Sequence, residues 1–210
     1  LIRMAERGGL PRQTFLSGIA LLAAAAGNTA LAMDQGDWLV RFGVSNVDPK
    51  SNNHPAVSVD SGTSATINFT YMMTANWGVE VLAAYPFEHD IYLVGGPKVG
   101  STKHLPPTVS LQYHFLPDAK FQPYVGLGVN YTHFFSEKLF GDLEGATLDL
   151  DGSWGFAGEI GADIMLSETW FLNGSLRYIG IESDAKVNGD AFGKVKIDPW
   201  VYGVHLGFRF

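Results

Sequence analysis

The sequence predicts an all-β protein, an eight-stranded antiparallel transmembrane β-barrel with short periplasmic turns and long extracellular loops. Three observations predict this fold. Apolar and polar residues alternate through eight separate segments, which is the period of a β-strand with one apolar face. The connections between these segments are short and long in turn, as in outer-membrane barrels. A leader of the kind that directs export precedes all of them.

The leader occupies the first 32 residues. Arg3, Arg7 and Arg12 precede an apolar run over residues 15–26, and small residues at 30–32 offer a cleavage site. This run is shorter than the roughly 20 residues that a membrane-spanning helix needs. We therefore expect a signal peptide at residues 1–32 and one barrel domain at residues 33–210.

The first four alternating segments cover residues 38–47, 65–73, 77–85 and 108–115. Each places aromatic and aliphatic side chains on one face and small or polar side chains on the other, as a strand between two different media requires. The four apolar faces are Trp38, Val40, Phe42 and Val44; Ile67, Phe69 and Tyr71; Trp77, Val79, Val81 and Tyr85; Val109, Leu111, Tyr113 and Phe115.

The last four segments cover residues 121–132, 154–166, 170–178 and 200–210, and they follow the same pattern. Eight such segments in series favour a barrel over a single exposed sheet. Their apolar faces are Val125, Leu127, Val129 and Tyr131; Trp154, Phe156, Ile160, Ile164 and Leu166; Trp170, Leu172, Leu176 and Tyr178; Trp200, Tyr202, Val204, Leu206, Phe208 and Phe210.

The connections differ in length in a regular way. Short links fall at residues 74–76, 116–120 and 167–169, and long ones at 48–62, 89–105, 136–152 and 183–193. In outer-membrane barrels the short turns are periplasmic and the long loops extracellular. With an even number of strands, both ends of the barrel domain then lie on the periplasmic side.

Alternation alone does not say which face is outside, because lipocalins are also exported eight-stranded barrels with an apolar interior. The polar faces, however, contain charges of both signs that could neutralise one another inside a barrel. Aromatic residues also gather near strand ends, as in the belts at membrane interfaces. We therefore expect an integral protein of the Gram-negative outer membrane, with lipid outside and a polar plug inside. The plug candidates are Arg41, Glu80, Glu159, Asp163, Arg177 and Arg209.

Composition excludes several other functions. The chain has no cysteine, so disulfides and cysteine-based metal sites are impossible, and its net charge of −7 disfavours nucleic acid. The six histidines show no metal-ligand spacing, and the acidic residues between 137 and 151 do not follow a calcium-loop pattern. His133 and Ser136 lie three apart, so on one strand they point to opposite faces. We expect no cofactor, no metal and no catalysis.

Prolines mark the loop end of the third and fourth segments. Pro86 ends the third, and Pro106 with Pro107 opens the fourth. Proline lacks the N–H that a sheet ladder needs, so it belongs at strand edges and starts. Ordinary strand termination explains this placement. A sharper hypothesis is a gap in the wall through which an apolar molecule could leave sideways, with Pro86, Phe87, Pro106 and Pro107 as candidates.

Several stretches, in this order, resemble the OmpW family of eight-stranded outer-membrane proteins, and together they cover nearly the whole barrel domain. They are Phe69-Thr70-Tyr71-Met72, Trp77-Gly78-Val79-Glu80, Ala84-Tyr85-Pro86-Phe87, His104-Leu105-Pro106-Pro107-Thr108, the run from Phe121 to Thr132, Ser153-Trp154-Gly155, Asp198-Pro199-Trp200-Val201-Tyr202 and Gly207-Phe208-Arg209-Phe210. The loops match less well.

The resemblance implies a narrow channel with an apolar upper lumen, used for uptake of small hydrophobic molecules that leave laterally into the membrane. Leu82, Phe134 and Ile179 would face this lumen near the loop end. Trp154 aligns with a family aromatic at the base of the lumen, although alternation places it on the lipid face; a bulge at Gly152 could turn it inward. The alternative is a structural or adhesive barrel, or a surface receptor, without transport. We expect the barrel-assembly machinery to recognise the C-terminal Phe210.

Overall fold

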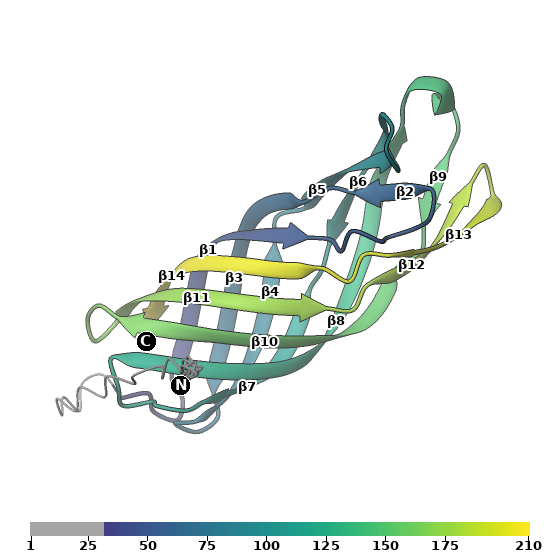
Figure 1. The fold of residues 1–210 in the computed structure, drawn as a ribbon. Helices are drawn as coiled ribbons and strands as arrows, with labels where there is room; N and C mark the ends of the chain where they lie inside the picture. The colour runs from purple at the N-terminus through teal and green to yellow at the C-terminus, as the bar shows by residue number, and fades with distance from the viewer. Residues whose placement is uncertain (1–31) are drawn as a thin grey trace, which may run out of the picture.

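The computed structural model describes residues 32–210, which form one closed barrel with smaller sheets beyond one end (Figure 1). The predicted signal peptide, residues 1–32, lies outside the described residues except for Ala32. Within the described part of the chain, no helix has the length and apolar character to cross a membrane.

Eight antiparallel strands make the barrel, one for each predicted segment. Each pairs with its neighbour in the order β10-β11-β14-β1-β3-β4-β7-β8, and pairing of β8 with β10 closes the cylinder. The predicted fold class is confirmed. The strands are β1 (Trp38–Asp48), β3 (Gly62–Met72), β4 (Trp77–Ala84), β7 (Thr108–His114), β8 (Phe121–Leu139), β10 (Ser153–Met165), β11 (Trp170–Ile179) and β14 (Trp200–Arg209).

The first and last strands of the barrel pair with each other. Their register runs from Leu39 opposite Arg209 to Asp48 opposite Trp200. The pairing continues to the last residue, because Trp38 and Phe210 exchange backbone hydrogen bonds of 2.9 and 3.1 Å. This closure places the C-terminus beside the short turns, at the end predicted to be periplasmic.

The short turns are fixed by side chains of the residue types that favour turns. The hydroxyl of Thr74 accepts hydrogen bonds from the backbone N–H groups of Asn76 and Trp77, and Ser167 does the same for Thr169 and Trp170. Such local bonds satisfy backbone groups that leave the sheet ladder. Three short turns therefore lie together at one end of the barrel.

The long connections contain strands of their own, which the sequence analysis did not predict. Residues 87–105 form a hairpin of β5 (Phe87–Leu93) and β6 (Lys98–Leu105), and residues 182–196 form a second hairpin of β12 (Glu182–Val187) and β13 (Asp190–Lys196). Short strands β2 (Val57–Val59) and β9 (Leu148–Leu150) and a 3-10 turn, η2 (Gly141–Leu143), complete this tier.

These additional strands form two sheets above the barrel, of which one continues the barrel sheet and the other is separate from it. The end of β8 pairs with β6, which pairs with β5 and then β2; the other sheet has the order β13-β12-β9. Figure 1 shows both sheets continuing past the end of the barrel that is opposite the C-terminus. We call the part formed by these strands and their turns the upper tier.

The two faces of the barrel match the alternation. Aliphatic and aromatic side chains on the outside of the barrel strands are exposed, as lipid contact requires. Aromatic rings also pair in two belts. Near the short turns the pairs are Trp38–Tyr71, Trp77–Tyr113 and Trp170–Phe208, and near the upper tier they are Tyr131–Trp154 and Tyr178–Trp200. Two such belts mark the interfaces of a membrane.

Candidate channel and its polar plug

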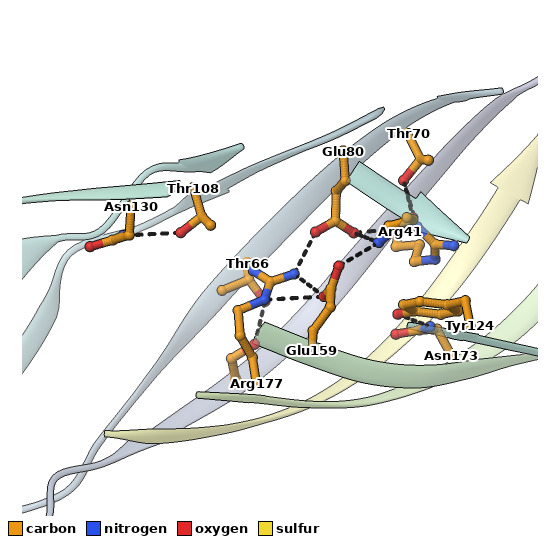
Figure 2. Close-up of polar contacts among 12 residues, drawn as sticks. Arg41, Thr66, Thr70, Glu80, Thr108, Tyr124, Asn130, Glu159, Asn173 and Arg177 are labelled. Carbon is orange, nitrogen blue, oxygen red and sulfur yellow. Dashed lines mark hydrogen bonds and ion pairs between the residues drawn. The ribbon is translucent and has the colours of Figure 1, made fainter. Parts of the chain in front are cut away.

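A network of buried charges fills the middle of the barrel (Figure 2). Arg41 on β1 is fully buried and donates to both carboxylate oxygens of Asp163 on β10, from Nε at 3.1 Å and from Nη2 at 2.7 Å. Its Nη1 donates to the Thr70 hydroxyl at 2.7 Å and lies 3.5 Å from Glu80. A two-pronged pairing of this kind is the strongest form of guanidinium–carboxylate contact.

The second guanidinium, of Arg177 on β11, links two carboxylates from opposite parts of the wall. It donates to Glu80 on β4 and to Glu159 on β10. Gln112 on β7 lies against the same two groups, and its Nε2 donates to Glu80 at 2.9 Å and to Glu159 at 2.7 Å. Side chains of five strands thus meet across the lumen at this level of the barrel and form one network of paired charges.

Five of the six predicted plug residues lie in this network, and Arg209 does not. Its guanidinium is at the short-turn end, where it donates to the backbone oxygens of Ala32 and Glu168 at 2.5 and 2.7 Å. The prediction that Arg209 belongs to the plug was wrong, because Arg209 is the last residue of β14 and therefore lies at the short-turn end, away from the network.

Sequence analysis missed the uncharged members of the plug. Gln112 bridges two carboxylates, and Asn173 donates to Asp163 at 2.8 Å and to the Tyr124 hydroxyl at 3.0 Å. Both amides occupy inward positions of the alternation, so a search for polar inward residues at the level of the charges could have found them.

Above the plug lies an apolar cavity of about 130 Å³ inside the upper tier. Aliphatic and aromatic side chains of both sheets line it, and four polar residues, His89, Thr102, His104 and Ser183, contribute to its wall. Below it, between this cavity and the plug, is a smaller space of about 20 Å³ bordered by Leu82, Phe87, Pro106, Ile179 and Arg177, among others. One continuous hydrophobic cluster, which includes Phe87, Phe134, Ile179 and Ile197, packs around both spaces.

Three of the four apolar-lumen candidates point inward, and Trp154 does not. Leu82, Phe134 and Ile179 are buried, whereas the side chain of Trp154 is 76 % exposed and packs on Tyr131 on the lipid-facing surface, with ring centroids 4.8 Å apart. The placement of Trp154 in the lumen was wrong. β10 pairs with β8 in unbroken register from Ser153 onward, so no bulge turns this side chain inward.

The two proline-containing segments, between β4 and β5 and between β6 and β7, interrupt the hydrogen-bonded pairing of adjacent strands in the barrel wall. The pairing of β4 with β7 ends at Leu82 opposite Thr108, and the pairing of β5 with β6 begins at Phe87 opposite His104. Between these points the backbone bonds go to the outer neighbours instead: Tyr85 N–H donates to Ala65 of β3, and Tyr131 N–H of β8 donates to Pro107.

The four residues predicted to border a gap in the wall lie at different depths at this interruption. Phe87 is buried against His104, with ring centroids 5.5 Å apart, and Pro106 is buried beside the small lumen space. Pro86 is half-buried and Pro107 is exposed on the outside. Proline rings therefore separate the apolar interior from the outer surface at this point.

A second interruption, which the sequence did not predict, lies between β10 and β12. The ladder of β10 with β11 ends at Ala157 opposite Ile179, followed by a bond from Gly180 N–H to the Phe156 carbonyl at 2.9 Å. Beyond it β12 pairs with β13 and β9, and a bond from Glu182 N–H to the Ser153 hydroxyl at 3.0 Å returns to β10. The strand pairing of the wall is thus interrupted at two places.

Among residues 32–210, no group of three or more histidine, aspartate or glutamate side chains is placed to hold a metal ion. His133 and Ser136 are both exposed near the end of β8. Two other histidines, His89 on β5 and His104 on β6, are buried in the cavity wall with their rings stacked at 4.8 Å. Burial lowers the pKa of His104 to about 3, helped by the neighbouring His89, and burial also lowers the pKa of His89.

Comparison with known proteins agrees with this architecture. "Outer membrane protein W" of Vibrio cholerae serotype O1 is 40 % identical over 93 % of this chain and 98 % of its own length. The crystal structure of the outer membrane protein OprG from Pseudomonas aeruginosa has a TM-score of 0.76 at 36 % identity, covering 86 % of this chain and 98 % of OprG. The dibenzothiophene metabolism operon protein PahQ of Pseudomonas aeruginosa is 25 % identical over 84 % of this chain and 90 % of its own length.

These similarities confirm an integral outer-membrane location. The sequence model of the OmpW family matches residues 34–210, which is nearly all of the described chain. The chain belongs to the OmpW family of outer-membrane β-barrel proteins.

Proposed function

We propose that the protein is an outer-membrane channel for passive uptake of small hydrophobic molecules, which leave the barrel sideways into the membrane. One observation carries this proposal: an apolar cavity in the upper tier lies above a plug of paired charges, and strand pairing in the wall is interrupted between the levels of the two. An apolar molecule that enters from outside has no favourable way through the plug, because it would have to displace hydrogen-bonded charges.

The width of the barrel supports the same conclusion. Eight strands enclose an interior that side chains can fill, so a wide aqueous pore is not available to this fold. The name of the relative PahQ links that protein to the metabolism of dibenzothiophene, an apolar aromatic compound. A small apolar solute is therefore the cargo that fits both the cavity and this relative.

The test is uptake of toluene into liposomes that hold the refolded barrel. Three proteins are compared with empty liposomes: the wild type, a variant combining Pro86→Ala, Pro106→Ala and Pro107→Ala, and Pro123→Ala as a control in the wall of β8 far from the interruption. The triple variant regains three N–H donors, which lets β4–β5 and β6–β7 pair more completely.

Uptake that exceeds the empty liposomes and falls only in the triple variant supports transport through the proline interruption. Uptake that is the same in all three proteins keeps the channel but moves its exit to the interruption between β10 and β12. No acceleration over empty liposomes contradicts the channel and favours a structural or adhesive barrel.

We also propose that the barrel-assembly machinery recognises the C-terminal aromatic. Phe210 is exposed on the lipid side, and its ring lies 5.8 Å from that of Phe208. Phe210→Ala should slow insertion of the barrel in cells while leaving refolding of the purified chain in detergent unchanged. Equal slowing in both settings would contradict a role in recognition.

A further inference from the structure

The apolar cavity reaches the surface at the outer end of the upper tier. Its floor, at His89 and His104, is buried, whereas four other side chains that line it are also exposed to solvent. They come from the segment before β2, the end of β5, η2 and β13, all in the tier beyond the barrel (Figure 1). We call these four residues the mouth of the cavity. They are Ala56, Leu93, Leu143 and Phe192.

Phe192 is the extra residue of a β-bulge in β13. Ala185 of β12 pairs with Gly193, but the next residue of β12, Lys186, pairs with Ala191. Phe192 therefore has no opposite residue in β12. Gly193 has a φ of +128°, a conformation that glycine adopts more readily than other residues. Bulges of this kind change the direction in which a side chain points.

The bulge turns the ring of Phe192 toward the cavity. Side chains of a regular strand alternate between its two faces, so without the bulge Phe192 would share the outer face of Lys194 and Lys196. Instead it lines the cavity together with Val195, which belongs to the opposite set. The irregular backbone thus places an aromatic ring at the mouth.

The other upper-tier sheet contains a similar bulge. The pairing of β5 with β6 shifts between Ile91 and Tyr92, and Val99 of β6 is the residue left over. Val99 lines the cavity on the same side as Thr102, although residues three apart point to opposite faces of a regular strand. One bulge in each sheet therefore turns an apolar side chain toward the same cavity, which favours a role in shaping it.

The ring of Phe192 packs on His54 from the other side of the mouth. The two ring centroids are 4.6 Å apart and the planes are tilted by 32°. The neighbouring Asn53 fixes this segment to both sheets, because its Nδ2 donates to the Lys196 carbonyl at 2.9 Å and its Oδ1 accepts from the Val59 N–H of β2 at 3.0 Å. The ring therefore extends from β13 to a part of the chain that is tied to β2.

We propose that Phe192 determines which apolar molecules enter the cavity, by limiting the width of its mouth. This inference rests on the proposed uptake of hydrophobic molecules and narrows their class to slim molecules of about the size of one benzene ring. A dry apolar cavity of about 150 Å³ holds one such molecule, and the cavity here has about 130 Å³. Bulkier apolar molecules are excluded by steric contact with the ring. Phe192 is the largest side chain of the mouth, so its removal widens the mouth most.

The test uses a single thiol inside the cavity, since the chain has no cysteine of its own. Ala185→Cys places this thiol on the buried cavity wall. Its labelling by N-ethylmaleimide and by the bulkier N-cyclohexylmaleimide is measured in lipid nanodiscs, each rate divided by that of the same reagent with glutathione. The thiol is combined with Phe192→Ala or with Phe140→Ala. Phe140 is the matched control, because it is 37 % exposed against 39 % for Phe192 but is not part of the cavity wall.

We expect Phe192→Ala to raise the N-cyclohexylmaleimide rate about fivefold or more and the N-ethylmaleimide rate less than twofold, because a wider mouth helps the bulkier reagent most. Phe140→Ala should change neither rate. Rates that Phe192→Ala leaves unchanged would overturn the proposal. An equal rise for both reagents would do the same, because it would indicate a loosened hairpin. Failure of both reagents to label the folded protein would show that the cavity has no open mouth.

Toluene uptake into liposomes separates this inference from the proposed function. Accelerated uptake together with N-cyclohexylmaleimide labelling that Phe192→Ala does not change overturns the role of Phe192 and keeps the channel. A selective rise in N-cyclohexylmaleimide labelling without any accelerated uptake supports Phe192 as the limit of the mouth and removes the channel.

Discussion

At the residue scale, Asp163 shows how the plug depends on complete pairing. Its carboxylate accepts from Arg41 and Asn173 and is fully buried. Removing one partner of a buried ion pair leaves an uncompensated charge, which costs far more than the intact pair contributes. The plug is therefore stable as a unit and sensitive to the loss of any one charge.

Asp163→Asn should lower the free energy of unfolding by about 3–5 kcal/mol, because an amide cannot neutralise the buried Arg41. Asp151→Asn is the matched control: Asp151 pairs with Lys186 at 3.1 Å, but both side chains are about half exposed. That change should cost at most about 1 kcal/mol. Urea unfolding in lipid vesicles measures both, and similar losses would contradict the plug as a buried network.

Single positions also show what the sequence could predict. Alternation correctly turned Arg41, Glu80 and Arg177 inward, because the side-chain period of a strand is independent of what surrounds it. For Trp154 it was more reliable than the family resemblance, which suggested the lumen. Arg209 was grouped with the plug only because it faces inward; its place one residue from the C-terminus already indicates that it lies near the short turns.

At the element scale, Gly155 lies where β10 approaches the start of the upper tier. A Cβ at Gly155 would lie 1.7 Å from the carbonyl oxygen of Gly180, which is backbone and cannot move aside without separating the strands. Gly174, on the lipid side of β11, has nothing within 4 Å of such a Cβ. The two glycines therefore have different roles on neighbouring strands of the wall.

Gly155→Ala should destabilise the barrel by roughly 1–3 kcal/mol, the usual cost of overpacking, and should break the bond from Gly180 to Phe156. Gly174→Ala should leave stability nearly unchanged. Urea unfolding compares the two, and amide exchange at Gly180 reports the bond. Equal stability of both variants would mean that the backbone at Gly155 is farther from the Gly180 carbonyl than the structure shows.

The hairpin of β5 and β6 should lose stability in acid. Burial lowers the pKa of His104 to about 3, whereas the unfolded chain titrates near 6.5. Between these values the unfolded hairpin binds more protons than the folded one, so stability falls as the pH drops below 6.5 and the loss is complete near pH 3. Asp60 and Asp90 oppose the fall at the adjacent His89, but burial is the larger effect.

Hydrogen exchange of the β5 and β6 amides, corrected for intrinsic rates, tests this at pH 7.0 and 4.5. Protection should decrease at pH 4.5 in the wild type and decrease less in His104→Phe. Protection that is independent of pH in both proteins would show that His104 is open to solvent.

All eight barrel strands were predictable because each one separates lipid from a polar interior and therefore alternates over seven residues or more. The upper-tier strands were missed for the opposite reason. They are short, lie in water and place charges such as Glu88 and Lys103 outside, so their composition is that of loops. The histidines at the cavity floor were missed with them, since their positions mean nothing until β5 and β6 are paired.

At the scale of the whole molecule, the plug joins strands from around the barrel. Charges from β1, β4, β10 and β11 and an amide from β7 meet across the lumen, so an ion crossing the middle would have to displace paired charges. The upper tier, by contrast, divides into two sheets around its cavity. Uptake and ion conduction should therefore be separable properties of this protein.

In planar lipid bilayers, the wild type should show no current above the protein-free baseline, even at concentrations that accelerate toluene uptake into liposomes. The reason is that an ion would have to displace paired charges that fill a narrow barrel. Conductance steps of the size of a water-filled pore would contradict the plug as the closed floor of the channel.

The division of the upper tier into two sheets has a consequence for which substitutions such a protein can accept during evolution. The sheet of β13, β12 and β9 forms much of the cavity wall, yet its strands pair with one another and leave the eight-strand ladder intact. Substitutions there can reshape the cavity without altering the part that inserts into the membrane. The shape of the cavity and membrane insertion can therefore evolve separately, and exchanging residues 182–196 between relatives is a direct way to transfer one without the other.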